Sequence, residues 1–316
     1  MVAVGRRPLG ASGIHVSELA LGSWRTYERI PRDAGIAVMR KARELGINFL
    51  DDARYNDETG TAPMKSGYSE VVFGELFRAS GWKREEVVLA NKLWWEFWPE
   101  QPAAAELEAS LERMRMDYID LAYAEKPPAG LGMKEIVHDI GRLIAAGKLR
   151  AWGVLNWKAE LIVQAADEAA AQGVPPPCAA QLAYSLVRRS PVEDREIANA
   201  LDDAHASVVA SFTLDGGALT GKYIEAGATG RLASSLGDES HQPALKAARE
   251  LRALAERRAT RPAPMAIAFA LLNPRVASVL FGATTPEQVV ENVSAIEIVE
   301  AMDDATIADL GKIGLQ

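Results

Sequence analysis

The sequence predicts a closed (β/α)8 barrel of the TIM-barrel class, and three observations support this prediction. Short apolar runs alternate with amphipathic helical stretches along almost the whole chain, which makes eight strand–helix units. The apolar runs are rich in Val, Leu and Ile without clean alternation, which is typical of a parallel sheet covered by helices on both faces. A length of 316 residues suits one such barrel, because these folds span about 200 to more than 400 residues.

The strands and helices follow one another in order. The strands are predicted at Leu19–Leu21, Asn48–Leu50, Val87–Ala90, Tyr118–Tyr123, Ala151–Val154, Ala179–Leu182, Val208–Ala210 and Ser278–Phe281. The helices are predicted over residues 33–45, 69–79, 103–115, 133–146, 158–172, 192–203, 263–272 and 286–294. The alternative is a doubly wound sheet, but that fold requires a Gly-rich phosphate turn after the first strand. The chain instead has LGSWR at this point, so the barrel is the better interpretation.

Four stretches lie outside the repeated unit. Arg7–Val16, with the letters GASG at its centre, predicts a β-hairpin before the barrel. Ala244–Ala259 has helical periodicity and predicts an extra helix between the seventh and eighth units. Arg54–Gly67 and Ile224–Gln242 are polar and predict long loops, which are usually functional or mobile. We expect residues 1–316 to form a single barrel domain.

Composition and charge narrow the class of protein. The chain is 48% hydrophobic and 25% charged, as in ordinary globular proteins, and its net charge of -8 argues against a nucleic-acid surface. It has no apolar run near the roughly 18 residues of a membrane span and no signal-peptide core. Cys178 is the one cysteine, and no His pair has metal-ligand spacing, so we expect neither disulfides nor a metal. These features predict a cytoplasmic protein and leave its oligomeric state open.

Reactive side chains follow the second and third predicted strands. In a (β/α)8 barrel the active site forms just after the strands, where this chain has Asp51, Tyr55 and Lys92. A Lys ammonium beside a Tyr hydroxyl lowers the Tyr pKa from about 10, and a carboxylate keeps that Lys charged. Tyr55 is then a candidate general acid toward an oxygen that gains negative charge. An Asp51–Lys92 ion pair that only closes the barrel top explains the positions equally well.

The chain resembles the aldo-keto reductases from Leu9 to about residue 296. The matching stretches occur in the family's order and read LGASGIHVSELALGSW, ELGINFLDDARY, VVLANKLWW, LEASLERMRMDYIDLAYAEKP, GKLRAWGVLNW, GALTGKY and VLFGATTPEQVVENVSAI. The resemblance is greatest to the branch of potassium-channel β subunits and their bacterial relatives. It implies a reductase barrel that binds NADP(H) extended across its C-terminal face, without a Rossmann fold.

The resemblance implies a catalytic tetrad with one substitution. Tyr55 matches the acid, Lys92 the partner that lowers its pKa, and Asp51 the residue that orients Lys92. The fourth member, normally His, falls at Glu125. In the family, steroid 5β-reductases carry Glu here and reduce a conjugated C=C bond, whereas potassium-channel β subunits carry Asn and turn over slowly. Burial that protonates Glu125 favours enone reduction, and a salt bridge from Glu125 to Lys92 or Lys126 is the alternative.

Two further positions depart from the family pattern. Asp51 and Tyr55 are one position closer together than in the family, so either Tyr55 reaches the site through a changed turn or Tyr68 replaces it. We expect Tyr55. The aromatic residue that stacks on the nicotinamide falls at Ser211, and its neighbour Phe212 is the candidate replacement.

The positions that match cofactor contacts surround the predicted barrel mouth. Asn156 and Gln181 match the partners of the nicotinamide carboxamide, and Lys222 and Arg231 match contacts to the pyrophosphate or 2′-phosphate. The other matches are Gly22, Ser23, Trp24, Ser211, Phe212, Gly282, Thr284, Gln288, Glu291 and Asn292. Thr284 to Asn292 also open the last helix, whose free N–H groups favour phosphate. A helix start that is only capped by Thr, with Pro286 at its first position, has a similar sequence.

Four tryptophans are candidates for the substrate pocket. Trp24, Trp94, Trp95 and Trp98 follow the first and third strands and favour a flat or apolar compound. Aromatic packing under a loop is the alternative. The sequence therefore predicts an NADP(H)-dependent reductase of a small carbonyl or enone substrate, and the alternative is a cofactor-binding regulatory subunit with little turnover.

Overall fold

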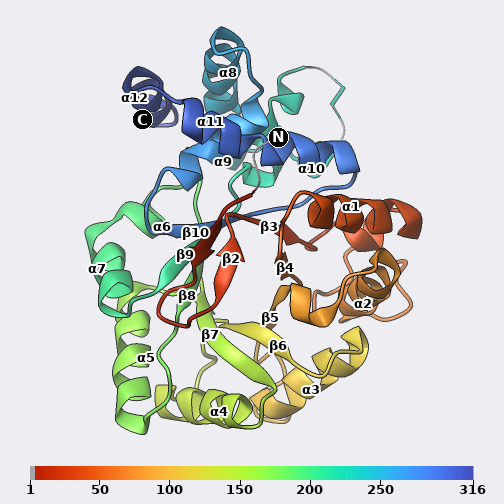
Figure 1. Ribbon diagram of the computed structural model, residues 1–316, viewed down its shortest axis with the longest axis vertical. Coiled ribbons are helices and arrows are strands. Elements are labelled where there is room, and N and C mark those ends of the chain that lie inside the picture. Colours follow the sequence, from red (N-terminus) through yellow and green to blue (C-terminus); the bar gives the residue numbers. More distant parts are fainter. Residues whose placement is uncertain (1–3, 226, 229, 316) are drawn as a thin grey trace.

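The computed structural model describes residues 4–225, 227–228 and 230–315, and its centre is a closed barrel (Figure 1). The barrel strands are β3 (Leu19–Gly22), β4 (Phe49–Asp51), β5 (Val88–Leu93), β6 (Ile119–Ala124), β7 (Leu149–Leu155), β8 (Ala179–Ala183), β9 (Ser207–Ser211) and β10 (Val276–Phe281). Each pairs in parallel with its neighbours in the order β10-β3-β4-β5-β6-β7-β8-β9, and the circle is closed. The predicted (β/α)8 class and all eight strand positions are confirmed.

Helices surround the barrel in Figure 1. They are α1 (Arg32–Glu44), α2 (Tyr68–Ser80), α3 (Ala103–Met114), α4 (Met133–Ala145), α5 (Ala159–Gln172), α6 (Ser190–Glu193), α7 (Arg195–Asp203), α8 (Gln242–Arg257), α9 (Pro262–Leu271), α10 (Pro286–Val293), α11 (Ala295–Ala301) and α12 (Asp304–Lys312). The helix predicted over residues 192–203 is two helices, because Asp194 between them has an extended backbone. The predicted extra helix is α8, whereas α11 and α12 were not predicted.

The apolar side chains form two large clusters that follow the alternation of the strands. Phe49, Ala90, Leu121 and Val209 belong to the cluster inside the barrel. Their strand neighbours belong to a second cluster between the barrel and the helices. Both faces of every strand are therefore covered, which explains the apolar runs without alternation. The same alternation decides which polar side chains at the strand ends point into the barrel.

The predicted hairpin closes the N-terminal end of the barrel. It consists of β1 (Arg6–Pro8) and β2 (His15–Ser17), and its loop places Leu9 and Ile14 in the inner cluster. Gly10 at the turn has φ +53°, and a Cβ atom there would lie 2.3 Å from the Cys178 carbonyl oxygen. The turn therefore requires glycine, and the opposite, C-terminal end of the barrel is left for the site.

Candidate active site at the C-terminal end of the barrel

A buried polar layer lies at the C-terminal end of the barrel interior. Asp51 ends β4, Lys92 lies on β5 and Gln181 on β8, and each is at most 4% exposed. The Lys92 Nζ atom donates to Asp51 Oδ1 at 2.7 Å and to the Asp52 carbonyl oxygen at 3.2 Å. The Gln181 Nε2 atom donates to Asp51 Oδ2 at 2.9 Å. Asp51 is thus held at both oxygens, and the Lys92 ammonium is fixed beneath the mouth.

Tyr55 lies directly above this layer. Its backbone N–H donates to the Ala53 carbonyl oxygen at 2.8 Å, so a tight turn compensates for the short spacing from Asp51. The half-buried Tyr55 ring has its centre 5.5 Å from Lys92 Nζ. Tyr68 is instead the first residue of α2, where its hydroxyl accepts from Arg32 Nη2 at 2.9 Å. The structure therefore places Tyr55, and not Tyr68, beside Lys92.

The pKa of Tyr55 is raised well above its ordinary value of 10.0, which corrects the expectation that Lys92 lowers it. Burial of the hydroxyl is the largest cause, followed by the carboxylates of Asp51, Asp52 and Glu28. The Lys92 ammonium, which pairs with Asp51 at 2.7 Å, does not outweigh these causes. Tyr55 is therefore a protonated phenol at neutral pH, as a proton donor must be.

Arg54 anchors the turn before Tyr55 and was not predicted as a site residue. Its guanidinium is 4% exposed and donates to Ser66 Oγ at 2.6 Å and to Glu96 Oε2 at 2.8 Å. Ser66 lies on the returning end of the predicted loop, where it forms an isolated bridge with Asn56. Arg54 thus ties the predicted loop to the segment after β5. The sequence shows only an arginine in a polar loop, and its burial became evident from the structure.

Asp52 is a second carboxyl at the site that the sequence reasoning did not single out. Asp52 directly follows β4, and its side chain points to the opposite face of the strand from that of Asp51. It is fully buried and accepts a hydrogen bond from Ser23 Oγ. Its Oδ2 atom has no partner among the described residues. Burial, with the nearby Glu70 carboxylate, raises the pKa of Asp52 well above its ordinary value. The two adjacent aspartates therefore differ: Asp51 pairs with Lys92, whereas Asp52 is buried and has a raised pKa.

Glu125 follows β6 at the rim and is half-buried. Its backbone N–H donates to the Leu93 carbonyl oxygen at 3.0 Å, which places it beside the end of β5. Within the described part of the chain, its carboxylate accepts from the Lys126 N–H at 2.9 Å and makes no ion pair with Lys92 or Lys126. The alternative that Glu125 forms a salt bridge with either lysine is therefore not what the structure shows.

The predicted nicotinamide contacts lie on neighbouring strands at the mouth. Asn156 follows β7, is exposed, and donates its backbone N–H to the Gln181 carbonyl oxygen at 3.0 Å. Ser211 ends β9 and is buried, whereas Phe212 is 43% exposed. The exposed ring of Phe212 lies 5.4 Å from the Trp24 ring, centre to centre. Phe212 is thus the exposed aromatic side chain next to Ser211, and its role as the replacement for the stacking residue stays a prediction.

The predicted phosphate contacts lie on the loop after β9 and at the start of α10. Lys222 and Arg231 have no carboxylate partner among the residues that the structure describes. Thr285 caps α10 by accepting from the Gln288 N–H, and Gln288 Oε1 in turn accepts from the Thr284 N–H at 2.8 Å. The other predicted contacts at this end are the exposed Gly282, the buried Asn292, and Glu291, which pairs with Arg261 at 3.0 Å. Gly22, which ends β3, has a Leu280 methyl group 3.0 Å from where its Cβ would lie.

The four predicted pocket tryptophans have different surroundings. Trp94 is half-buried, and its ring centre lies 6.2 Å from that of Tyr55, edge to face. Trp24 is half-buried beside Phe212. Trp95 is 3% exposed and belongs to the core cluster outside the barrel, and Trp98 packs against the same cluster. Trp24 and Trp94 therefore face the mouth beside Tyr55, whereas for Trp95 the alternative of aromatic packing is correct.

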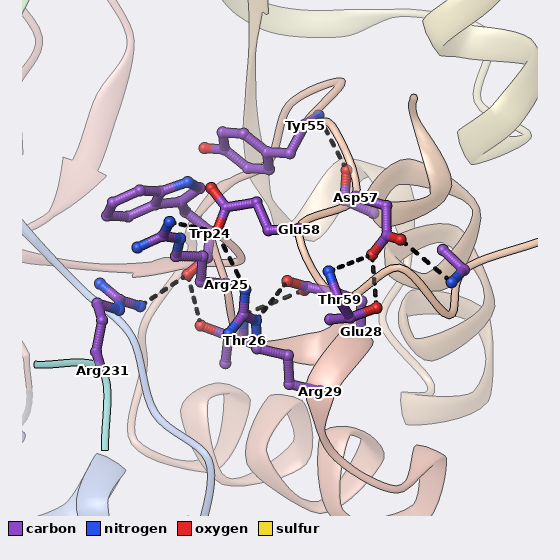
Figure 2. Close-up of polar contacts among 12 residues, drawn as sticks. Trp24, Arg25, Thr26, Glu28, Arg29, Tyr55, Asp57, Glu58, Thr59 and Arg231 are labelled. Carbon is purple, nitrogen blue, oxygen red and sulfur yellow. Dashed lines mark hydrogen bonds and ion pairs between the residues drawn. The ribbon is translucent and has the colours of Figure 1, made fainter. Parts of the chain in front are cut away.

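Charged side chains from three loops meet around Trp24 (Figure 2). The Arg25 and Arg231 guanidinium carbons lie 4.9 Å and 4.6 Å from the Trp24 ring centre. Arg231 Nη2 also donates to the Trp24 carbonyl oxygen at 3.1 Å. Glu58, on the loop after Tyr55, forms an ion pair with Arg25. This cluster borders the mouth next to Tyr55.

No three His, Cys, Asp or Glu side chains in residues 4–225, 227–228 and 230–315 are grouped as metal ligands. No helix in the described part of the chain is both long enough and apolar enough to cross a membrane.

Comparison with known proteins identifies one family match and two similar proteins. The sequence pattern described as the aldo/keto reductase family matches residues 18–314. A Schizosaccharomyces pombe protein, provisionally named voltage-gated potassium channel subunit beta, is 30% identical over 326 aligned positions, which cover 97% of this chain and 92% of that protein. An Oryza sativa subsp. japonica protein with the same provisional name is 30% identical over 310 positions, which cover 92% of this chain and 90% of that protein.

Proposed function

Since this chain belongs to the aldo/keto reductase family, we propose that it is an NADP(H)-dependent oxidoreductase that reduces a small carbonyl or enone compound. Family membership makes it an oxidoreductase; the choice of NADP(H) and the substrate class are the proposal. The observation that carries it is the buried Asp51–Lys92 pair at 2.7 Å, with the Tyr55 ring beside it at the mouth of a closed barrel. A pair that only filled the barrel would not require an ionisable phenol above it.

The residues at the mouth fit a dinucleotide phosphate. Lys222 and Arg231 are cations without a carboxylate partner in the described chain, and both belong to the loop after β9. Gly230 has φ +131°, and a Cβ there would lie 2.5 Å from Lys222 Nζ, so the loop leaves this space free around the ammonium group. The Thr213 hydroxyl, one residue beyond Phe212, is buried and has no hydrogen-bond partner among the residues that the structure describes. Two unpaired cations beside an open mouth favour a cofactor with an extra phosphate, NADP(H), over NAD(H).

The chain's own residues supply the proton and hold the charges. When bound, NADPH supplies the hydride. Tyr55 donates its hydroxyl proton to the substrate oxygen, and its raised pKa keeps that proton in place beforehand. The Lys92 ammonium, 5.5 Å from the ring centre, stabilises the phenolate that remains. Asp51 holds Lys92 in position, and Trp24 and Trp94 exclude water from the apolar part of the substrate.

Glu125 is proposed to decide between C=O and C=C reduction. Its side chain is at the rim, where it is half-buried and not neutralised by Lys92 or Lys126. A carboxyl at this point leaves room for an enone to slide deeper than an imidazole would allow. The Glu125→His variant is therefore expected to shift the ratio of enone to aldehyde reduction toward aldehydes. If both activities fall together at a constant ratio, this role for Glu125 is wrong.

The test of the main proposal is NADPH oxidation at 340 nm with an aldehyde, a ketone and an enone. Turnover by the purified chain and its loss in the Tyr55→Phe variant, with NADPH binding retained, is the expected result. Turnover that survives in Tyr55→Phe but is lost in Tyr68→Phe would assign the acid to the other tyrosine. No oxidation above background with any substrate class would count against the reductase.

A second candidate is a cofactor-binding regulatory subunit with little turnover. It is favoured by the names of the two relatives, which describe voltage-gated potassium channel subunits. Glu125 and Ser211, in place of the family's His and stacking aromatic residue, also favour it. Tight NADPH binding, measured by quenching of tryptophan fluorescence, together with very slow turnover would support this candidate over the reductase.

A further inference from the structure

Arg25, at the mouth of the barrel, has a strained backbone, and neither the cofactor contacts nor the core packing explain its side chain. Eight non-glycine residues in the described chain have φ between +45° and +56°. Four of these lie within three residues after a barrel strand: Arg25, Trp95, Asn156 and Phe212. A left-handed backbone disfavours every residue except glycine, and residues held this way gather at functional sites. Asn156 and Phe212 are proposed cofactor contacts and Trp95 packs in the core, so Arg25 is the one whose side chain is unexplained.

The Arg25 side chain is held at the mouth by two contacts. Its guanidinium lies 4.9 Å from the Trp24 ring centre, a distance typical of cation–π contacts, and forms an ion pair with Glu58. Its Nε atom is buried and has no partner among the described residues. Figure 2 shows the Tyr55 side chain with its hydroxyl end pointing toward the Trp24 indole. The Glu28 carboxylate, which hydrogen-bonds Arg29 in this cluster, is near enough to raise the pKa of Tyr55.

Positive charge exceeds negative charge in this cluster. The guanidinium groups are Arg25, Arg29 and Arg231, and the carboxylates paired with them are Glu28 and Glu58. Glu58 is shared, since it pairs with Arg25 and also with Arg29 at 3.2 Å. Arg231 has no carboxylate among the described residues, and the proposed cofactor phosphate accounts for it. In the described part of the chain, the one carboxylate paired with Arg25 is therefore that of Glu58, which is exposed and is shared with Arg29. An incoming anion can replace it.

We propose that Arg25 binds a carboxylate on the substrate, so that the preferred substrates are carbonyl compounds with a carboxylate at the end remote from the reacting carbon. The inference rests on the proposed reductase function and adds the substrate class. A substrate whose carbonyl oxygen accepts from Tyr55 extends past Trp24 toward Arg25. The guanidinium offers a planar fork that matches a carboxylate, and Glu58 holds this fork in place until the substrate carboxylate replaces it.

The experiment compares 4-carboxybenzaldehyde with 4-formylbenzamide, which has the same shape without the charge. The wild-type chain is expected to have the larger kcat/KM for the carboxylate. Arg25→Gln should reduce the ratio of the two kcat/KM values about tenfold or more, the effect of losing a charge-assisted hydrogen bond. Glu58→Gln should change the ratio in the opposite direction, because it removes the competing carboxylate.

Arg275→Gln is the matched control. Arg275 pairs with Asp202 at 2.6 Å and precedes β10, so it lies at the N-terminal end of the barrel and its loss removes the same charge far from the mouth. This variant should keep the wild-type ratio. If it changes the ratio as much as Arg25→Gln does, the effect is one of net charge and the proposal is wrong.

Three outcomes overturn the proposal while leaving the reductase function intact. The wild-type chain could reduce both aldehydes equally well, Arg25→Gln could lower both kcat/KM values by the same factor, or Arg25→Gln could weaken NADPH binding at an unchanged ratio. The last result would assign Arg25 to the cofactor phosphate. If neither aldehyde is reduced, the proposed function has failed, and titration of the protein's tryptophan fluorescence with terephthalate still tests the anion site. Terephthalate that binds wild type and Arg25→Gln equally would then refute it.

Discussion

Removal of the Lys92 ammonium should destabilise the fold strongly, because it leaves a buried carboxylate unpaired. Asp51 and Lys92 are 2% and 4% exposed, and their atoms are 2.7 Å apart. In Lys92→Met the side-chain volume is nearly kept, but Asp51 retains only its hydrogen bond from Gln181. Breaking a buried pair in this way costs about 3–5 kcal/mol.

The size of the effect follows from the length of the chain. The unfolding entropy of 316 residues is about 0.66 kcal/mol per kelvin, at about 2.1 cal/mol/K per residue. A loss of about 3–5 kcal/mol therefore lowers Tm by about 5–8 °C. The double variant Asp51→Asn with Lys92→Met has no buried charge left, so it should regain at least half of this loss. Replacing both members of a buried pair often costs little.

Thermal unfolding followed by circular dichroism measures all three variants under one buffer. Lys148→Met is the control, because Lys148 pairs with Glu108 at 3.2 Å on the surface and both side chains are exposed. A surface pair contributes about 0–1 kcal/mol, so this Tm should change by less than about 2 °C. The reasoning is refuted if Lys92→Met has the same Tm as the wild type, or if the double variant has a lower Tm than Lys92→Met.

Three further predictions concern Asp52, Arg54 and Gly230. The raised pKa of Asp52 means that its stabilising effect is present below the ordinary value of 3.8 and is lost as pH rises. Asp52→Asn should therefore raise Tm more at pH 7 than at pH 4, and an equal gain at both pH values would contradict the burial argument. Arg54→Met removes the 2.8 Å contact to Glu96, so hydrogen exchange in residues 55–67 should become about tenfold faster or more; unchanged exchange would show that Arg54 does not anchor the loop. Gly230→Ala places a Cβ 2.5 Å from Lys222 Nζ at φ +131°, so NADPH should bind about tenfold more weakly by fluorescence titration, and an unchanged Kd would exclude Lys222 from the cofactor site.

Much of the fold followed from local patterns. The strands could be predicted because burial on both faces makes each of them an apolar run in the sequence. The helices could be predicted because consecutive units of a strand and a helix repeat along the chain. The break at Asp194 was not predicted, because the apolar spacing continues through it while the backbone turns away. The helices α11 and α12 at the end of the chain were also not predicted.

The site was predicted less completely. Asp51, Tyr55, Lys92 and Glu125 lie at the mouth where their positions after the strands placed them, and their catalytic roles stay predictions. The direction of the Tyr55 pKa was wrong, because the expectation counted the charge of Lys92 and not the burial and the carboxylates around the phenol. Trp95 was assigned to the pocket because it follows a strand, but its side chain turns into the core.

The sequence by itself determined the number and order of the strand–helix units, and therefore which side chains follow which strand. It determined the family as well, since the matching segments keep their order along the chain. Only the tertiary structure decided how adjacent residues divide between the two faces of a strand, so that Asp51 meets Lys92 while Asp52 is buried outside the barrel. It also brought Arg231 to the carbonyl of Trp24, 207 positions away. The physical reason is that closure of the barrel joins the first strand to the last, and no local pattern contains the distances that closure creates.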